Sequence, residues 1–242
     1  MWAWWQLSQC KRAGRPSWMA CAGDLECPVL AYIVFMAPLL AEELLVLARS
    51  PGGAPLISEW AETRGVAGSL LADLAAAGRI GCIASRLVVV TDRAATGRPV
   101  LDSVLQQIAT GRDRSPRCWV GKLASQQAIR RAEDLVAWRG APDGDVVPQR
   151  EELLARLSEV LTTESEPDAR TAALAALVAA CGLSGKLFSG VDRRARDRRL
   201  AAVSAGQWAA AGVRASRRAA MARKVAVAPI WMYLELPENV WR

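Results

Sequence analysis

The chain has 242 residues, enough for one large domain or two small ones with a substantial core. Apolar residues make up 52% of it and are dominated by alanine, leucine and valine, which favours close-packed helices over a sheet sandwich. The absence of histidine excludes a Ser-His-Asp triad, a Cys-His dyad, a His-ligated zinc and a histidine general base.

Six cysteines are scattered along the chain without a C-x-x-C pair. This spacing fits neither a zinc site nor a dense disulfide framework. We therefore expect buried, reduced thiols in a cytoplasmic protein that holds no metal and no cofactor. The six are Cys10, Cys21, Cys27, Cys82, Cys118 and Cys181.

The net charge of +7 is concentrated near the C-terminus. Between Lys186 and Lys224 there are 11 basic and 2 acidic residues, which leaves 20 basic against 22 acidic residues elsewhere. The whole surplus therefore lies in the last helices. Such a segment is expected to attract a polyanion, either acidic lipid head groups or nucleic acid.

Residues 1–35 differ from the rest, because tryptophans and basic residues crowd them without helical periodicity. The apolar run over residues 29–40 is shorter than the ~20 residues that span a bilayer. Our hypothesis is that Met36 is the natural start and that residues 1–35 are an upstream extension or a disordered tail. Mass analysis of the N-terminus of protein expressed from its own gene tests this, and an intact extension would refute it.

The middle of the chain predicts helices and one strand pair. A helix over residues 39–48 comes first, and Ser58 is placed as the N-cap of the next. An apolar helix from Gly68 onward is stopped by Gly78, and a short hairpin and a further helix follow. The hairpin strands are expected over residues 80–84 and 86–90, and the helix over residues 101–108.

The second half predicts further helices separated by one clear break. Gly and Pro residues at 140–148 form that break. Gly206 is expected to divide the last, basic helical stretch, and Pro229 to begin a C-terminal tail. This gives a helical domain over residues 36–228 and a tail over 229–242. The helices are predicted at 119–138, at 150–161, at 168–180 before Gly182, and at 192–227.

The common catalytic and nucleotide-binding motifs are absent, and we find no enzyme in the sequence. No G-x-x-x-x-G-K-[ST] loop and no G-x-G-x-x-G turn is present. Glu42 and Glu43 are adjacent, so we expect them to diverge on a helix and serve solubility. Asp73 is expected on a solvated helix flank, and Arg79 beside the carbonyl groups that end its helix.

Four blocks in order resemble the Golgi phosphoprotein 3 family, in the form found in bacteria, particularly actinobacteria. The first three are LLAEELLVL from Leu39, GSLLADLAAAGRI from Gly68 and TGRPVLDSVL from Thr96. The fourth is DARTAALAAL from Asp168. The resemblance covers roughly residues 36–227 and implies one compact, mainly α-helical, non-catalytic domain with a short β-hairpin.

The resemblance also implies a lipid site. Eukaryotic relatives bind phosphatidylinositol-4-phosphate at the membrane face, and also the tails of Golgi enzymes. Their lipid pocket uses a Trp before the second helix, an Arg on that helix and two Args on the mid-chain helix. Trp60 lies within two positions of the family Trp. The Arg positions fall on Ala67, Ser125 and Ala128.

A substitute head-group site could form from other residues. Trp60 and Arg64 are four apart and share a helix face, and Arg130 and Arg131 could approach from the mid-chain helix. The first hypothesis is thus a peripheral membrane protein, cytoplasmic and bound to anionic lipid. The alternatives are a nucleic-acid-binding protein, or an adaptor for an acidic protein partner. Both would use a basic surface made of Arg193, Arg194, Arg196, Arg198 and Arg199.

Overall fold

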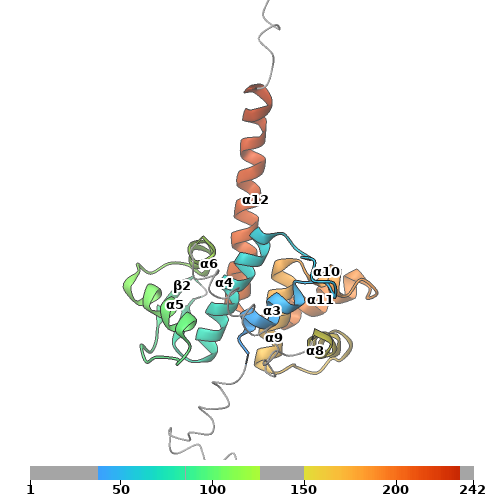
Figure 1. Cartoon of the computed structure of the whole chain (residues 1–242), viewed down its shortest axis with the longest axis horizontal. Coiled ribbons are helices and arrows are strands. Elements are labelled where there is room, and N and C mark those ends of the chain that lie inside the picture. The colour runs from blue at the N-terminus through green and yellow to red at the C-terminus, as the bar shows by residue number, and fades with distance from the viewer. Residues whose placement is uncertain (1–37, 85, 126–149, 235–242) are drawn as a thin grey trace, which may run out of the picture. The chain divides into compact units, whose positions relative to one another are not determined.

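The computed structural model describes residues 38–84, 86–125 and 150–234, with side chains up to residue 222 (Figure 1). These residues form helices and one two-stranded antiparallel sheet, as the composition predicts. The helices before the break are α3 (Leu40–Leu47), α4 (Glu59–Ala76), α5 (Pro99–Thr110) and α6 (Pro116–Ala124). Those after it are α8 (Arg150–Thr162), α9 (Ala169–Cys181), α10 (Ser184–Leu187), α11 (Arg193–Val203) and α12 (Trp208–Leu234).

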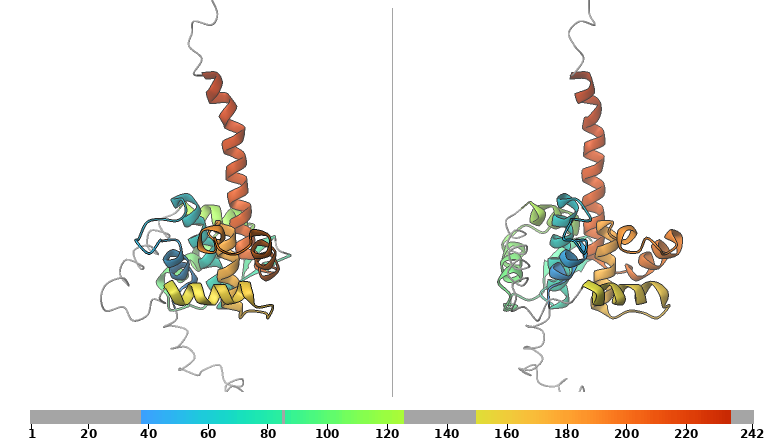
Figure 2. Two further views of the ribbon diagram at one scale, coloured as in Figure 1. Left: turned by 90° about the vertical axis from the view of Figure 1, so that its right-hand side faces the viewer. Right: turned by 45° about the vertical axis from the view of Figure 1, so that its right-hand side comes forward.

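Helix α4 is the centre of the core. It packs against α3, α5, α6, α9 and α12, and Figures 1 and 2 show it beside α9 and α12. Ser58 precedes it with extended backbone, as predicted for an N-cap. The helix predicted to start after Ser58 and the apolar helix predicted from Gly68 are one continuous helix, which passes through glycines at positions 65 and 68. Both glycines are buried, which lets neighbouring elements approach the axis closely.

The predicted hairpin is confirmed. Strands β1 (Ile80–Ile83) and β2 (Leu87–Val90) pair antiparallel, with Ile80 opposite Val90. Gly78 ends α4 with a φ of +69°, a left-handed conformation that glycine adopts without strain. The side chain of Arg79 does not bind the helix end as expected. It pairs with Asp92, because the hairpin returns the chain to that point.

The ends of the later helices follow their sequence signals. Asp168 caps α9 by accepting hydrogen bonds of 3.0 Å from the backbone N–H groups of residues 170 and 171. Gly182 ends α9 with a φ of +77°, and Gly206, with a φ of +80°, lies between α11 and α12. Helix α12 continues past Pro229 to Leu234, so the predicted boundary at residue 228 falls inside a helix. The predicted helix at 119–138 is α6 up to Ala124, and its remainder lies outside the described residues.

The predictions for three carboxylates are wrong. Glu42, Glu43 and Asp73 are all buried, with exposed fractions of 2%, 1% and 8%. The reason is that α3 packs against α4, α8 and α9, while α4 is surrounded by helices, so neither has a fully solvated flank. Arg170 of α9 lies between two of these groups, 3.2 Å from the Glu43 carboxylate and 3.9 Å from that of Asp73.

The expectation of buried cysteines holds for only one of the described thiols. Cys181 is buried, Cys82 is half-buried and Cys118 is exposed, and all three are free. Burial raises the pKa of the Cys181 thiol to about 12, so this thiol stays protonated.

Candidate functional site at the start of α4

Trp60 and Arg64 form a stacked pair in the first turns of α4. The Arg64 guanidinium carbon lies 3.9 Å from the centroid of the half-buried Trp60 ring, within the range of a cation–π contact. Arg64 Nη1 also donates a hydrogen bond of 3.1 Å to the backbone carbonyl of Trp60. The four-residue spacing predicts this shared helix face, and the structure confirms that the two side chains meet.

Helix α12 supports the pair from the other side. Arg64 Nε donates a hydrogen bond of 3.2 Å to the hydroxyl of Ser216, a residue 152 positions later in the chain. Helix α6 lies at the same place, because a Cβ on Gly121 would stand 3.9 Å from that hydroxyl oxygen. The start of α4, the second half of α6 and the first third of α12 therefore converge around Ser216.

Arg217, the next residue of α12, directs its guanidinium to the C-terminal end of α9. Its Nη1 donates to the carbonyl of Ala180 in the last turn of α9, and Gly182 lies directly beside its guanidinium group. A cation is favourable there because helix carbonyls carry partial negative charge at a C-terminus. We refer to Trp60, Arg64, Ser216 and Arg217 as the Trp60 cluster.

The Trp60 cluster has a positive character. Partial burial lowers the pKa of the Arg64 guanidinium, but arginine remains charged near neutral pH. Glu62, the nearest acidic residue of α4 after Glu59, is buried and bound by both terminal nitrogens of Arg49 at 2.6 Å. Arg49 therefore neutralises Glu62, and Glu59, one residue before Trp60, is exposed to solvent.

The other expected site positions contribute differently. Ala67, the position that the resemblance matches to the family's helix arginine, lies in the core with no exposed surface. Ser125 caps the end of α6, and its hydroxyl donates to the Lys122 carbonyl at 2.8 Å. Arg130 and Arg131 lie outside the described residues, as does Ala128, so their part in the site stays a prediction.

The basic surface predicted on α11 divides into two kinds of arginine. Arg193, Arg194 and Arg198 are exposed. Arg196 is only 8% exposed and donates to the Phe188 carbonyl, while Arg199 Nε donates to the Val160 carbonyl at 2.9 Å. The last two hold neighbouring segments in place through these bonds, so three of the five predicted arginines are presented to solvent.

Among the described residues, no group of histidine, cysteine, aspartate or glutamate side chains could hold a metal ion. None of the helices in that part of the chain combines the length and the apolar character needed to cross a bilayer.

The described residues form a mainly helical domain with one short hairpin, and a partly buried Trp–Arg pair lies near the start of α4. The sequence profile of the family described as Golgi phosphoprotein 3 (GPP34) matches residues 40–141 and 142–220, which is most of the chain. The protein belongs to the Golgi phosphoprotein 3 family, as its sequence predicts. A comparison with curated proteins gives no match.

Proposed function

We propose that the protein is a non-enzymatic peripheral membrane protein, which binds anionic phospholipid head groups on the cytoplasmic side through the Trp60 cluster. The observation that carries this proposal is the stacking of Arg64 on half-buried Trp60, with Arg64 bonded to Ser216 of α12. Arg217, the next residue of α12, holds a second guanidinium at the end of α9. Membership of the Golgi phosphoprotein 3 family supports it.

The physical basis is a combination of interfacial tryptophan and positive charge. Tryptophan is favoured at the boundary between head groups and acyl chains, where its ring meets both media. Each cation near an acidic membrane surface adds about 1 kcal/mol of attraction. The guanidinium of Arg64 is already fixed by two hydrogen bonds, so its binding to a phosphate would cost little conformational entropy.

The proposed ligand is the class of acidic head groups rather than one phosphoinositide. Ala67 is buried and uncharged where the family pocket has an arginine. A site with fewer fixed arginines makes fewer directional bonds to a particular phosphate pattern, while it keeps its charge attraction to any acidic surface.

Vesicle co-sedimentation tests the proposal. Neutral phosphatidylcholine vesicles are compared with vesicles that also carry phosphatidylserine or phosphatidylinositol-4-phosphate. We expect both acidic kinds to bind the wild type, and Trp60→Ala and Arg64→Ala to weaken that binding. Equal binding of neutral and acidic vesicles would contradict the proposal, as would unchanged binding by both variants. Thermal unfolding of each variant shows whether it is folded.

A second candidate function rests on the exposed arginines of α11. Arg193, Arg194 and Arg198 would attract nucleic acid through its backbone, or an acidic protein partner. Duplex DNA added as a competitor to the vesicle assay separates the two candidates. If DNA removes all vesicle binding and Arg194→Gln/Arg198→Gln removes DNA binding, the protein binds polyanions through the basic surface of α11 and not through the Trp60 cluster.

A further inference from the structure

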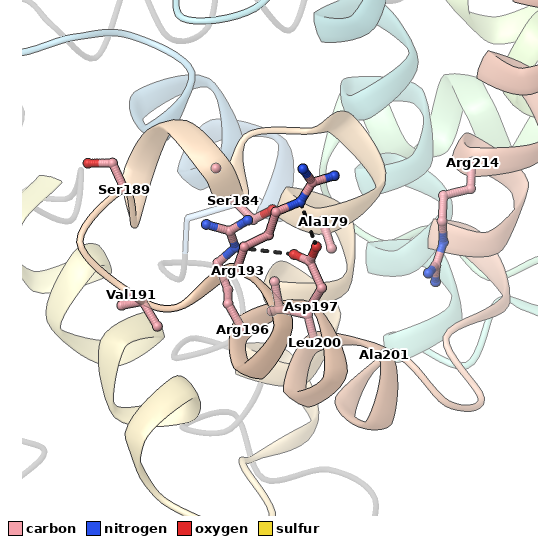
Figure 3. A pocket seen from close by; sticks show the side chains of 11 residues that line it. Ala179, Ser184, Ser189, Val191, Arg193, Arg196, Asp197, Leu200, Ala201 and Arg214 are labelled. Carbon is pink, nitrogen blue, oxygen red and sulfur yellow. Dashed lines mark hydrogen bonds and ion pairs between the residues drawn. The ribbon is translucent and has the colours of Figure 1, made fainter.

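A cleft of about 770 Å³ lies between α10, the loop after it, α11 and α12 (Figure 3). Three arginines from two helices line it, Arg193 and Arg196 on α11 and Arg214 on α12. Figure 3 shows Arg214 on the opposite side of the cleft from the two α11 arginines. The volume falls within the range of sites that hold small molecules.

Arg196 is the fixed element of the cleft. It is only 8% exposed, and it donates from Nη1 to the Phe188 carbonyl at 3.2 Å and from Nε to Asp197 at 3.2 Å. Its remaining nitrogen, Nη2, faces Gly185 of α10, where a Cβ would stand 3.9 Å away. The guanidinium is therefore held in one orientation, with one edge toward the cleft-lining Gly185.

The charge of the lining is unbalanced. Asp197 is the carboxylate among the lining residues, and it stands against three guanidinium groups. Its side chain is 52% exposed and forms ion pairs with both Arg196 and Arg193, and the distance to Arg193 is 3.7 Å. Exposed ion pairs of this kind are weak, so Asp197 compensates the arginines only in part. The three arginines and one aspartate leave a formal excess of two positive charges at the cleft.

The cleft lies apart from the Trp60–Arg64 pair, while Arg217 of the cluster follows Arg214 by three residues and shares its face of α12. Arg214 lines the cleft, while Ser216 binds Arg64 in the cluster. Two residues along an α-helix correspond to a rotation of about 200°, so the two side chains leave α12 on nearly opposite faces. A ligand in the cleft would therefore not compete directly for the head-group contacts of Trp60 and Arg64.

We propose that this cleft binds a small ligand carrying a phosphate group. Arg196 provides the fixed contact, and Arg193 and Arg214 supply the additional charge that a dianion requires. The apolar side chains of Ala179 and Leu200 line the same cleft and accommodate the part of the ligand next to the phosphate. The phosphate can belong to a soluble phosphomonoester or to the head group of phosphatidic acid.

Calorimetric titration of the full chain with glycerol 3-phosphate tests the soluble source, with sodium chloride at matched ionic strength as the blank. We expect a dissociation constant of about 1 mM or lower. The cleft variant is Arg193→Gln/Arg214→Gln. Its matched control is Arg194→Gln/Arg198→Gln, which removes the same charge from exposed positions that do not line the cleft.

A third variant blocks the cleft without changing its charge. A Cβ at position 185 meets nothing nearer than 3.9 Å, so Gly185→Leu adds volume toward Arg196 rather than into the core. We expect both Gly185→Leu and the cleft variant to weaken binding by about tenfold or more, while the control stays within about twofold of wild type. Thermal unfolding without ligand shows that each variant is folded.

Co-sedimentation with vesicles of phosphatidylcholine and phosphatidic acid tests the lipid source. Loss of binding by the cleft variant in either assay, with the control unaffected, supports the proposal and identifies the source. Equal losses by cleft variant and control would overturn it in favour of diffuse surface attraction. The proposal would also be overturned if neither assay shows binding that the Arg193→Gln/Arg214→Gln variant weakens.

Discussion

Asp73, in the last third of α4, accepts a hydrogen bond of 3.0 Å from the backbone N–H of Leu40, the first residue of α3. Glu42 accepts a similar bond of 2.7 Å from the N–H of Leu39. Two buried carboxylates thus satisfy the N–H groups that a helix start leaves without intrahelical partners. The contact also joins the first described helix to the central one.

The first prediction concerns pH. Burial raises the pKa of Asp73 from 3.8 to about 7, while Arg170 and the Leu40 bond oppose this rise and Glu43 and Glu42 add to it. At a pH between these two pKa values, Asp73 holds a proton in the folded chain and releases it in the unfolded chain. The contribution of Asp73 to stability is therefore full below about pH 4 and is lost as pH rises through about 7.

Asp73→Asn removes this titration and keeps an oxygen for the Leu40 N–H. From pH 5 to pH 8 we expect the free energy of unfolding of wild type to fall relative to the variant, by about 2–3 kcal/mol. Urea unfolding at several pH values measures it. Asp113→Asn, at an exposed position, should follow wild type at every pH. Parallel curves for wild type and Asp73→Asn would show that Asp73 does not titrate in this range.

The second prediction concerns Arg170. This side chain binds the Glu43 carboxylate and the Pro38 carbonyl, and it lies 3.9 Å from the Asp73 carboxylate. Arg170→Met therefore leaves two buried acids without this cation. Arg170 is about one-third exposed, which reduces the effect, and we expect a loss of about 2–3 kcal/mol at pH 8.

The loss should be smaller at pH 5, because a protonated Asp73 needs no counter-charge. Urea unfolding of Arg170→Met at both pH values gives the comparison. Arg86→Met, at an exposed position, should change stability by less than about 0.5 kcal/mol. A loss at pH 5 as large as that at pH 8 would be evidence against coupling between Arg170 and Asp73.

The third prediction concerns two helical glycines. A Cβ on Gly68 of α4 would lie 2.3 Å from a Val213 methyl group of α12, whereas a Cβ on Gly121 of α6 meets only the Ser216 hydroxyl at 3.9 Å. Gly68→Ala should therefore destabilise the protein by about 1–3 kcal/mol through overpacking. Gly121→Ala should stabilise it by up to about 1 kcal/mol through helix propensity. Equal effects in urea unfolding would contradict the close approach of α4 and α12.

Local signals predicted the parts of the fold that depend on few neighbouring residues. The N-cap Asp168 and the left-handed Gly182 define both ends of α9, and each acts within one helical turn. The contact between Trp60 and Arg64 was predictable for the same reason, since an i,i+4 spacing fixes it.

Burial depends on how many elements surround a helix, and periodicity along one helix does not show this. Asp73 faces away from the predicted apolar side of α4, yet α3 covers that flank and brings the Leu40 N–H to it. Ser216 and Arg217 escaped prediction because they join the Trp60 cluster through the packing of α12, far along the chain. The clustering of basic residues near the C-terminus was visible, but not that Arg217 would bind the end of α9.

The most direct test of head-group binding by the Trp60 cluster is a comparison of two charge-matched double variants on phosphatidylserine vesicles. Arg64→Gln/Arg217→Gln removes two cations from the cluster, and Arg194→Gln/Arg198→Gln removes two exposed cations from α11. At about 1 kcal/mol per cation we expect the first variant to bind roughly thirtyfold more weakly than wild type, and the second to bind nearly as wild type does. The reverse order would contradict the account and assign membrane binding to α11.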